Sequence, residues 1–346
     1  MNRKVTLIPG DGIGPEIMAA VKAVFAALQA PIEWEEENAG VSAWKEHGEL
    51  LPQSLLKSLE QNRIGLKGPI TTPVGEGFRS VNIQLRQHFD LYANVRPSKS
   101  LEAIPTRFKN VDIVIIRENT EGLYSGLEYF DERLGIVDSI CRITMKGCDR
   151  IVRSAFEYAK VNGRKKVTLV HKANILKQAG AVLLNAGKVI APEYPGIVME
   201  DLIIDNMCMQ LVTKPEKYDV IVTTNLFGDI LSDLAAGLVG GLGVAAGANI
   251  GSDIALFEAV HGSAPDIAGK GLANPTAILK SGVMMLRYLG EEHLAERLEN
   301  AIEITLGNRA LATADLGGKA GTMKFTEGII KQLELQAVDL QTSSSL

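Results

Sequence analysis

The chain of 346 residues has few cysteines, and none of them has the spacing of a metal site. Its three cysteines are Cys141, Cys148 and Cys208, and an odd number of thiols without a secretory segment points to a reducing compartment. The first strand-like residues begin at Val5, which leaves no room for a signal peptide. We therefore expect buried thiols in a cytoplasmic protein, with a processed organellar chain as the alternative.

The sequence also lacks an excess of positive charge and any long apolar run. It has 36 basic and 41 acidic residues and a formal net charge of −5, whereas nucleic-acid binding needs a basic face or stripe. No apolar run approaches the length of a membrane span. We expect no nucleic-acid partner and no membrane association. A GxxxxGK[ST] loop is missing too, which argues against a magnesium-dependent phosphoryl-transfer enzyme.

Positive charge is missing from one long segment in particular. Between Lys217 and Lys270 there is no Lys or Arg. The acidic residues of the same segment are Asp219, Asp229, Asp233, Asp253, Glu258 and Asp266. An acidic segment without compensating charge favours a cation.

The chain has the pattern of an α/β protein. Hydrophobic residues make up 46% of it, enough for a substantial core, and near-continuous apolar strands alternate with helices. This pattern predicts a mostly parallel sheet with flanking helices on both faces. The expected strands are 4–8, 111–117, 166–170, 198–205 and 219–225. Gly-rich connections at 237–251 and 262–271, helices at about 275–289 and 291–306, and a frayed tail from about residue 336 follow.

The loop PGDGIGPE after the first strand resembles a dinucleotide-binding GxGxxG motif. Pro15 stands where the third glycine would be required, and proline suits the first turn of a helix. We interpret the loop as a tight turn before a helix that starts near Pro15.

Two aspartates follow the apolar run YDVIVTTN, in the sequence NLFGDILSD. If the run is a strand and the rest a helix, Asp229 and Asp233 share a helix face at the carboxyl end of a strand, where open α/β sheets place ligands. Ala236 and Gly240 continue that face and would let a ligand approach. A divalent-metal site is therefore one hypothesis. The alternative is a solvated face opposite the apolar stripe of Ile230, Leu231, Leu234, Ala235 and Leu238.

A complementary anion site is expected around residue 80. Ser80 is placed to cap a helix that carries Asn82 and Arg86 one turn apart, and free helix N–H groups and guanidinium both favour carboxylates. Arg96 and Arg117 lie where two strands emerge. Three arginines and several aspartates predict a site for a polyanion held with a metal ion. For the helix alone, an N-cap serine with a surface arginine is the alternative.

Two proton-transfer candidates lie after strands. Tyr124 follows the strand that ends at Arg117, and Lys172 follows the next strand. Packing and simple surface charge are the ordinary roles of such residues. A bound divalent cation nearby would disfavour the ammonium form of Lys172, so that it could act as a base.

Six motifs together resemble the β-decarboxylating dehydrogenases: RSVNIQLR, YANVRP, RENTEGLYSG, HKANI, NLFGDILSD and HGSAPDIAGKGLANPTA. The resemblance runs over nearly the whole chain. It implies the isopropylmalate dehydrogenase-like fold, with a discontinuous large domain (1–97 and 240–346) and a smaller central domain (98–239) that carries a clasp at about 125–145. It also implies a homodimer with shared active sites, and associations beyond the dimer are left open.

The resemblance further implies NAD- and metal-dependent oxidative decarboxylation of isocitrate. It assigns the γ-carboxylate of that substrate to Ser80 and Asn82. The other carboxylates are assigned to Arg86, Arg96 and Arg117.

For the metal, Mg²⁺ or Mn²⁺, the resemblance implies Asp229 and Asp233 of one protomer together with Asp205 of its partner. By itself, Asp205 would be interpreted as a helix cap. Lys172, also from the partner, resembles the base that takes the 2-hydroxyl proton, and Tyr124 resembles the acid that protonates the product enolate. Oxygen ligands suit these hard cations.

The resemblance places NAD against the loop HGSAPDIAGKGLANP. Asp266 would accept hydrogen bonds from the ribose and repel a 2′-phosphate, whereas NADP-using relatives carry lysine and tyrosine at Asp266 and Ile267 and a tyrosine at Ala314. Asp266 as a loop cap is the alternative. The other implied contacts are Thr72 and Asn174 near the nicotinamide, and His261, Gly262, Ala264 and Asn274 around the adenine.

Two alternatives remain within the family. Homoisocitrate dehydrogenases share RENTEGLY but differ over VGEGFRSVN, where the role of Glu76 is unassigned. Non-catalytic regulatory subunits share the fold, but they would be expected to lose proton-transfer or metal residues that this chain retains.

Overall fold

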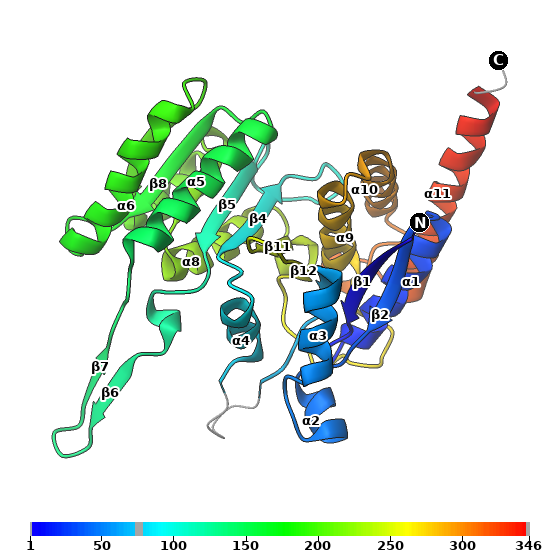
Figure 1. Cartoon of the computed structure of the whole chain (residues 1–346). Coiled ribbons are helices and arrows are strands. Elements are labelled where there is room, and N and C mark those ends of the chain that lie inside the picture. Colours follow the sequence, from blue (N-terminus) through cyan, green and yellow to red (C-terminus); the bar gives the residue numbers. More distant parts are fainter. Residues whose placement is uncertain (1, 73–78, 344–346) are drawn as a thin grey trace.

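The computed structural model describes residues 2–72 and 79–343, and within them ten strands form a single sheet (Figure 1). Glu76 lies outside these residues. The sheet order is β2 (Ile32–Glu36), β1 (Arg3–Ile8), β3 (Ile64–Lys67), β12 (Ala255–Ala259), β11 (Ala246–Ile250), β4 (Ala93–Lys99), β5 (Asp112–Glu118), β10 (Val220–Thr223), β8 (Lys166–His171) and β9 (Val198–Ile203).

Neighbouring strands are parallel except at the centre of the sheet. There β11 and β4 are antiparallel to each other, and each is antiparallel to its outer neighbour, β12 or β5. Two parallel blocks therefore run in opposite directions and meet at these central strands. The mostly parallel α/β sheet predicted from the apolar runs is confirmed.

Helices cover both faces of the sheet, but the two faces are packed differently. One continuous core lies beneath α1 (Gly14–Ala27), α5 (Met145–Val161), α6 (Lys177–Ile190), α9 (Thr276–Tyr288), α10 (Glu292–Gly307) and α11 (Thr322–Ser343). The opposite face carries two smaller cores. The first lies under α3 (Gln53–Asn62) and α4 (Val81–His88), and the second under α7 (Ile204–Thr213) and α8 (Asn225–Leu238). The short helix α2 (Val41–His47) precedes α3.

Polar side chains fill the space between these two smaller cores. Strand residues alternate between faces, and on β5 Val114 and Ile116 belong to the continuous core while Ile113 and Ile115 face the second side. Arg117 shares the latter face. By the same alternation, the polar residues on this face between β3 and β4 include Lys67, Asn94, Arg96, Asn249 and Glu258. The apolar packing is thus interrupted where the predicted arginines lie.

The glycine-rich loop before α1 is a packed turn, as predicted. A Cβ on Gly12 would lie 1.9 Å from the carbonyl oxygen of Ser263, so the loop packs backbone to backbone. The carboxylate of Asp11 accepts three backbone hydrogen bonds at 2.8–3.0 Å, two from the start of α2 and one from Thr71. Pro15 stands in the first turn of α1.

Several predicted boundaries were wrong. Strand β9 ends at Ile203, so Asp205 lies in the first turn of α7, where a carboxylate interacts favourably with the helix dipole. The expected Gly-rich connection at 237–251 contains β11. Helix α11 continues to Ser343 instead of fraying from Gln336. Of the thiols expected to be buried, only Cys148 is buried, whereas Cys141 is exposed and Cys208 is partly exposed.

An isolated hairpin extends away from the body of the chain (Figure 1). It consists of β6 (Glu128–Asp131) and β7 (Ile136–Ser139), inside the segment 125–145 that the sequence predicts as a clasp. Its exposed apolar side chains include Phe130 at 57% and Val137 at 59%. The clasp role and the two-domain division remain predictions, and the proposed boundary at residues 97 and 98 falls inside β4. Among the described residues, no helix combines the length and apolarity that crossing a membrane requires.

Candidate active site

Residues at the start of α8 fix the orientation of the Arg117 side chain. Its side chain is only 1% exposed, and its Nε and Nη2 donate hydrogen bonds to Oδ1 of Asn225 at 3.0 and 2.7 Å. Its Nη1 forms an ion pair with Asp229. Gly228 makes this approach possible, since a Cβ there would lie 2.4 Å from Cγ of Arg117. The NLFGD motif therefore orients a guanidinium as well as presenting a carboxylate.

The other two predicted arginines lie near Glu258 of the sheet: Arg86 pairs with its carboxylate directly, and Arg96 interacts with it through its charge. Nη2 of Arg86 lies 3.2 Å from Oε1 of Glu258, and Nε of Arg96 donates to Oδ1 of Asn94 at 2.7 Å. Burial lowers the pKa of Arg96 to about 10; the charge of Glu258 opposes this shift, while Arg86 and Arg117 add to it. Arg96 lies within β4 instead of at its end as predicted. The cluster is a concentration of positive charge suited to a polyanion.

Tyr124 and Asp229 form the acid-bearing side of the same site. Tyr124 lies in a short 3₁₀ helix (Leu123–Ser125) after β5, its ring centroid is 5.0 Å from Cζ of Arg117, and its hydroxyl donates to Asp229. Burial and then Asp229 raise the pKa of Tyr124, so it holds its proton at neutral pH. Burial and then Asp229 also raise the pKa of Asp233. A bound cation would offset the repulsion between these two carboxylates.

The buried face of α8 is rotated relative to the predicted apolar stripe. Ile230, expected in the apolar stripe, is 49% exposed, whereas Ala236, expected on the aspartate face, is buried. The buried face therefore turns toward Gly228 and Ser232, which places Asp229 at its edge, beside Arg117.

Thr72 takes the capping role that the sequence assigned to Ser80. The backbone N–H of Val81 donates to Oγ1 of Thr72 at 3.1 Å, and the Ser80 side chain makes no capping bond to α4. The predicted cap was wrong: the acceptor is Thr72, nine positions before Val81, and not the residue next to the helix. Oδ1 of Asn82 is buried and has no hydrogen-bond partner among the described residues. The Ser80 hydroxyl therefore does not cap the helix, and Oδ1 of Asn82 is a hydrogen-bond acceptor without a donor.

Lys172 and Asp205 form a second cluster. They pair with each other across the ends of β8 and β9, and the hydrogen bond from Lys172 lowers the pKa of Asp205. Within residues 2–72 and 79–343, no three acidic, histidine or cysteine side chains are grouped as metal ligands, so Asp205 does not join Asp229 and Asp233 in one chain. The exposed Asn174 lies in the same turn as Lys172.

His171, which sequence reasoning missed, supports this turn. Its Nδ1 accepts the backbone N–H of Ala173 at 3.0 Å, so Nε2 carries the proton shared with Asp201, also at 3.0 Å. The position of this histidine directly before the predicted base Lys172, in HKAN, could have indicated its supporting role from the sequence.

The predicted NAD loop lies beside the PGDGIGPE turn. Burial lowers the pKa of His261, and its Nε2 is buried without a partner among the described residues. Gly262 and Asp266 are exposed, and Ala264 has a positive φ of 38°. Here the chain presents an unsatisfied polar atom and an exposed carboxylate.

Asn274 at the end of this loop is fixed by a residue that sequence reasoning missed. Its Nδ2 donates to Oδ2 of Asp315 at 2.9 Å, and its Oδ1 accepts the N–H of Thr276, also at 2.9 Å. Asp315 belongs to the TADLGG segment, so two distant segments meet at the predicted adenine contact.

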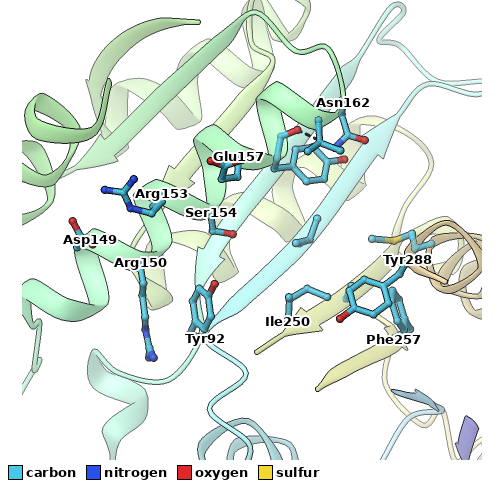
Figure 2. Close-up of a pocket in the computed structure, with 15 residues that line it drawn as sticks. Tyr92, Asp149, Arg150, Arg153, Ser154, Glu157, Asn162, Ile250, Phe257 and Tyr288 are labelled. Atoms are coloured by element: carbon cyan, nitrogen blue, oxygen red, sulfur yellow. Dashed lines mark hydrogen bonds between the residues drawn. The ribbon is translucent and has the colours of Figure 1, made fainter. Parts of the chain in front are cut away.

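A groove of about 690 Å³ lies on the other face of the central strands (Figure 2). Val95, Ala248 and Phe257 line it, and they alternate along their strands with residues of the arginine face. In Figure 2, side chains of α5 line one side of the groove, and Phe257 and Tyr288 line the other. The groove contains none of the predicted site residues.

The site defines a class of protein: an α/β enzyme with anchored arginines for a polyanion, carboxylates suited to a hard cation, and a protonated tyrosine beside them. A family model described as isocitrate/isopropylmalate dehydrogenase matches residues 4–332. The chain belongs to this family.

Relatives with known names cover almost the whole chain. A mitochondrial NAD isocitrate dehydrogenase regulatory subunit of Dictyostelium discoideum is 50% identical over 336 residues, which cover 96% of this chain and 92% of that protein. The mitochondrial catalytic subunit 5 of Arabidopsis thaliana is 51% identical, covering 95% and 88%. The crystal structure of isocitrate dehydrogenase from Methylococcus capsulatus is 52% identical with a TM-score of 0.92, covering 96% and 99%.

The names of these relatives bear on two predictions, the cellular location and the assembly. The Dictyostelium and Arabidopsis relatives, and the human NAD isocitrate dehydrogenase alpha chain at 48% identity, are described as mitochondrial, so the predicted cytoplasmic location was wrong. The number and spacing of the cysteines, on which that prediction also rested, do not distinguish a cytoplasmic protein from an organellar one. The relatives are also described as subunits, which points to heteromeric assemblies among them.

Proposed function

We propose that this chain catalyses the oxidative decarboxylation of isocitrate to 2-oxoglutarate and CO₂, with NAD as hydride acceptor and Mg²⁺ or Mn²⁺ as metal. The observation that carries this proposal is the convergence of Arg86, Arg96 and Arg117 on the polar patch that also presents Tyr124 and Asp229. Isocitrate has three carboxylates and one hydroxyl. A site with several oriented guanidiniums matches such a polyanion better than a monocarboxylate.

Substrate selection is assigned to the N-terminal turn of α4. Ser80 and Asn82 would bind the γ-carboxylate, and the unpartnered Asn82 amide supports this assignment. Isopropylmalate, whose isopropyl group has no hydrogen-bonding capacity, would leave both polar groups unsatisfied. Arg86, Arg96 and Arg117 would bind the remaining carboxylates.

Two side chains are assigned to proton transfer. Lys172 of the partner subunit, in its neutral form, would take the proton of the 2-hydroxyl as hydride leaves C2. Loss of CO₂ from the β-keto acid then leaves an enolate, and Tyr124 would deliver its proton to C3. The raised pKa of Tyr124, caused by burial and then by Asp229, suits a group that must arrive protonated.

The residues present fit a divalent cation. Asp229 and Asp233 are adjacent carboxylates whose mutual repulsion contributes to the raised pKa of Asp233, after burial. Together with Asp205 of the partner subunit, they would hold Mg²⁺ or Mn²⁺ through oxygen ligands alone. Such an ion would supply Lewis-acid polarisation of the substrate C2 oxygen.

The loop after β12 fits NAD, which would supply the hydride acceptor. The unpartnered Nε2 of His261 and the fixed amide of Asn274 would border the adenine with Gly262 and Ala264, and the exposed Asp266 would accept the ribose hydroxyls. Thr72 and Asn174 are assigned to the nicotinamide half. Thr72 accepts the Val81 N–H with one lone pair, which leaves its O–H as a donor for such a contact.

The assembly we propose is a homodimer with shared sites, closed in part by the β6–β7 hairpin. That hairpin exposes apolar side chains such as Tyr129 at 62%, which an isolated chain would leave in water. Because the relatives are named as subunits, a heteromer that provides the same partner residues is the alternative.

Steady-state assays with isocitrate, homoisocitrate and 3-isopropylmalate, each with NAD and NADP, test the proposal. We expect the highest kcat/KM with isocitrate and NAD, and loss of activity in EDTA. Homoisocitrate as the best substrate would support the alternative within the family. No turnover with any of them would support the regulatory alternative, the role for which the Dictyostelium relative is named.

Replacing Asp266 with lysine should shift the cofactor preference toward NADP by about 10- to 100-fold, measured as the ratio of the two kcat/KM values. The substitution removes an acceptor for the 2′-hydroxyl and offers a cation to a 2′-phosphate. Asp253→Lys, at an exposed aspartate outside the loop, controls for the general change in charge. An unchanged ratio would remove Asp266 from cofactor selection.

A further inference from the structure

Glu258 lies within the sheet beneath the arginine cluster. Its side chain is buried, and β12 places it opposite Lys67 of β3 and Gly247 of β11. Its Oε2 lies 2.9 Å from Nζ of Lys67, and its Oε1 lies 3.2 Å from Nη2 of Arg86. One buried carboxylate therefore joins a cation inside the sheet to a cation on α4.

Arg96 reaches the same carboxylate environment by crossing a glycine. A Cβ on Gly247 would lie 3.3 Å from Nε and 3.4 Å from Cδ of Arg96, so the side chain passes closely over β11. Asn94 fixes Nε of Arg96, and Oδ1 of Asn249 in turn accepts a hydrogen bond from Asn94 at 2.8 Å. The arginine is thus anchored on the side that faces the sheet.

Glu258 is ionised in this environment. Burial alone would raise the pKa of its carboxyl group, but the charges of Lys67, Arg86 and Arg96 hold it far below the usual range. A single negative charge faces three positive ones, which leaves the cluster net positive. An ion pair with Lys67 would be enough to neutralise a buried carboxylate, so the added contact with Arg86 on a different element calls for an explanation.

We propose that Glu258 is a positioning residue for the substrate arginines: it holds the Arg86 guanidinium directly and that of Arg96 through its charge, while Lys67 fixes the carboxylate itself. The inference rests on the proposed function, because it assigns Arg86 and Arg96 to substrate carboxylates. Anchoring one edge of a guanidinium removes rotamer freedom before the substrate binds, so less entropy is lost on binding.

Two variants separate positioning from simple packing. Glu258→Gln cannot accept from both cations at full strength and should raise KM for isocitrate by about 10- to 100-fold, with KM for NAD unchanged and a lowered Tm. The double variant K67M/E258Q removes the buried lysine left without its partner. It should recover much of the Tm while KM for isocitrate stays raised.

Glu35→Gln is the matched control. Glu35 also has several side-chain partners, but it lies on the edge strand β2 and accepts hydrogen bonds from Ser58 and Asn62. This variant should leave both KM values unchanged. A double variant whose KM for isocitrate returns to that of the unmodified protein would reduce Glu258 to a structural partner of Lys67 and overturn the inference.

Calorimetric measurement of isocitrate binding in the presence of Mg²⁺ distinguishes failure of the positioning role of Glu258 from failure of the proposed function. If the unmodified protein binds isocitrate and E258Q binds it with the same Kd, the positioning role fails while the proposed function stands. If the unmodified protein neither binds nor oxidises isocitrate, the proposed function fails, and the inference fails with it. A weaker Kd in E258Q and in the double variant, but not in E35Q, supports the positioning role.

Discussion

Replacing Lys172 with methionine is expected to lower kcat for isocitrate oxidation by about 10²- to 10⁴-fold, the range that general-base catalysis contributes. Methionine has similar length and apolar volume but cannot accept the 2-hydroxyl proton. KM for isocitrate should change little, since the carboxylates are assigned to other residues. The measurement is steady-state NADH formation, with Lys177→Met as a control at an exposed lysine in the first turn of α6.

The intermediate of the reaction makes this prediction more specific. Oxalosuccinate has no hydroxyl proton to lose, so K172M should still decarboxylate it, and direct assay of that partial reaction checks this. An equal loss in oxidation and in decarboxylation would contradict the base role. It would instead place Lys172 with Asp205, its ion-pair partner in the chain, as a structural contact.

Replacing Asp229 with asparagine is expected to reduce turnover by at least about 10³-fold, because metal ions stabilise transition-state charge by several kcal/mol. Removal of the cation with EDTA should have the same consequence in the unmodified protein. Mn²⁺ binding, followed by electron paramagnetic resonance in the presence of isocitrate, provides a readout that does not depend on turnover. The D229N protein should show no signal from protein-bound Mn²⁺.

The control for this variant is Asp253→Asn, since Asp253 belongs to the same acidic segment and is exposed. It should bind Mn²⁺ as the unmodified protein does. Full activity of the unmodified protein after exhaustive chelation would contradict the metal assignment and leave Asp229 as the ion-pair partner of Arg117 and the acceptor of the Tyr124 hydroxyl.

The sequence predicted those parts of the fold and site that depend on local pattern. Apolar runs identified β1, β5, β8 and β10, and turn chemistry identified the packed loop before α1. Arg117 and Asp229 were expected to share a site, and they form an ion pair. Asp233 was expected beside Asp229, and the two carboxylates interact.

What the sequence did not reveal depends on contacts between distant segments. Glu258 meets Arg86 across 172 positions, and only the register of β12 against β3 and β11 brings it under the arginines. One miss is more local: Thr72, nine positions before Val81, accepts the backbone N–H that begins α4, whereas a capping rule considers only the residue adjacent to the helix. Strands β11 and β12 lie close to glycines that suggested an irregular connection, and their place in the sheet outweighs weak local propensity.

The central claim is that each active site takes Asp229 from one protomer and Lys172 from the other. The direct test mixes K172M and D229N chains, each inactive alone, and lets the protomers exchange. A hybrid dimer then has one site with both residues intact and one site with neither. Random assortment should restore about one quarter of the activity of the unmodified protein. Hybrid dimers that form, as verified by native mass spectrometry, but stay inactive would contradict the account.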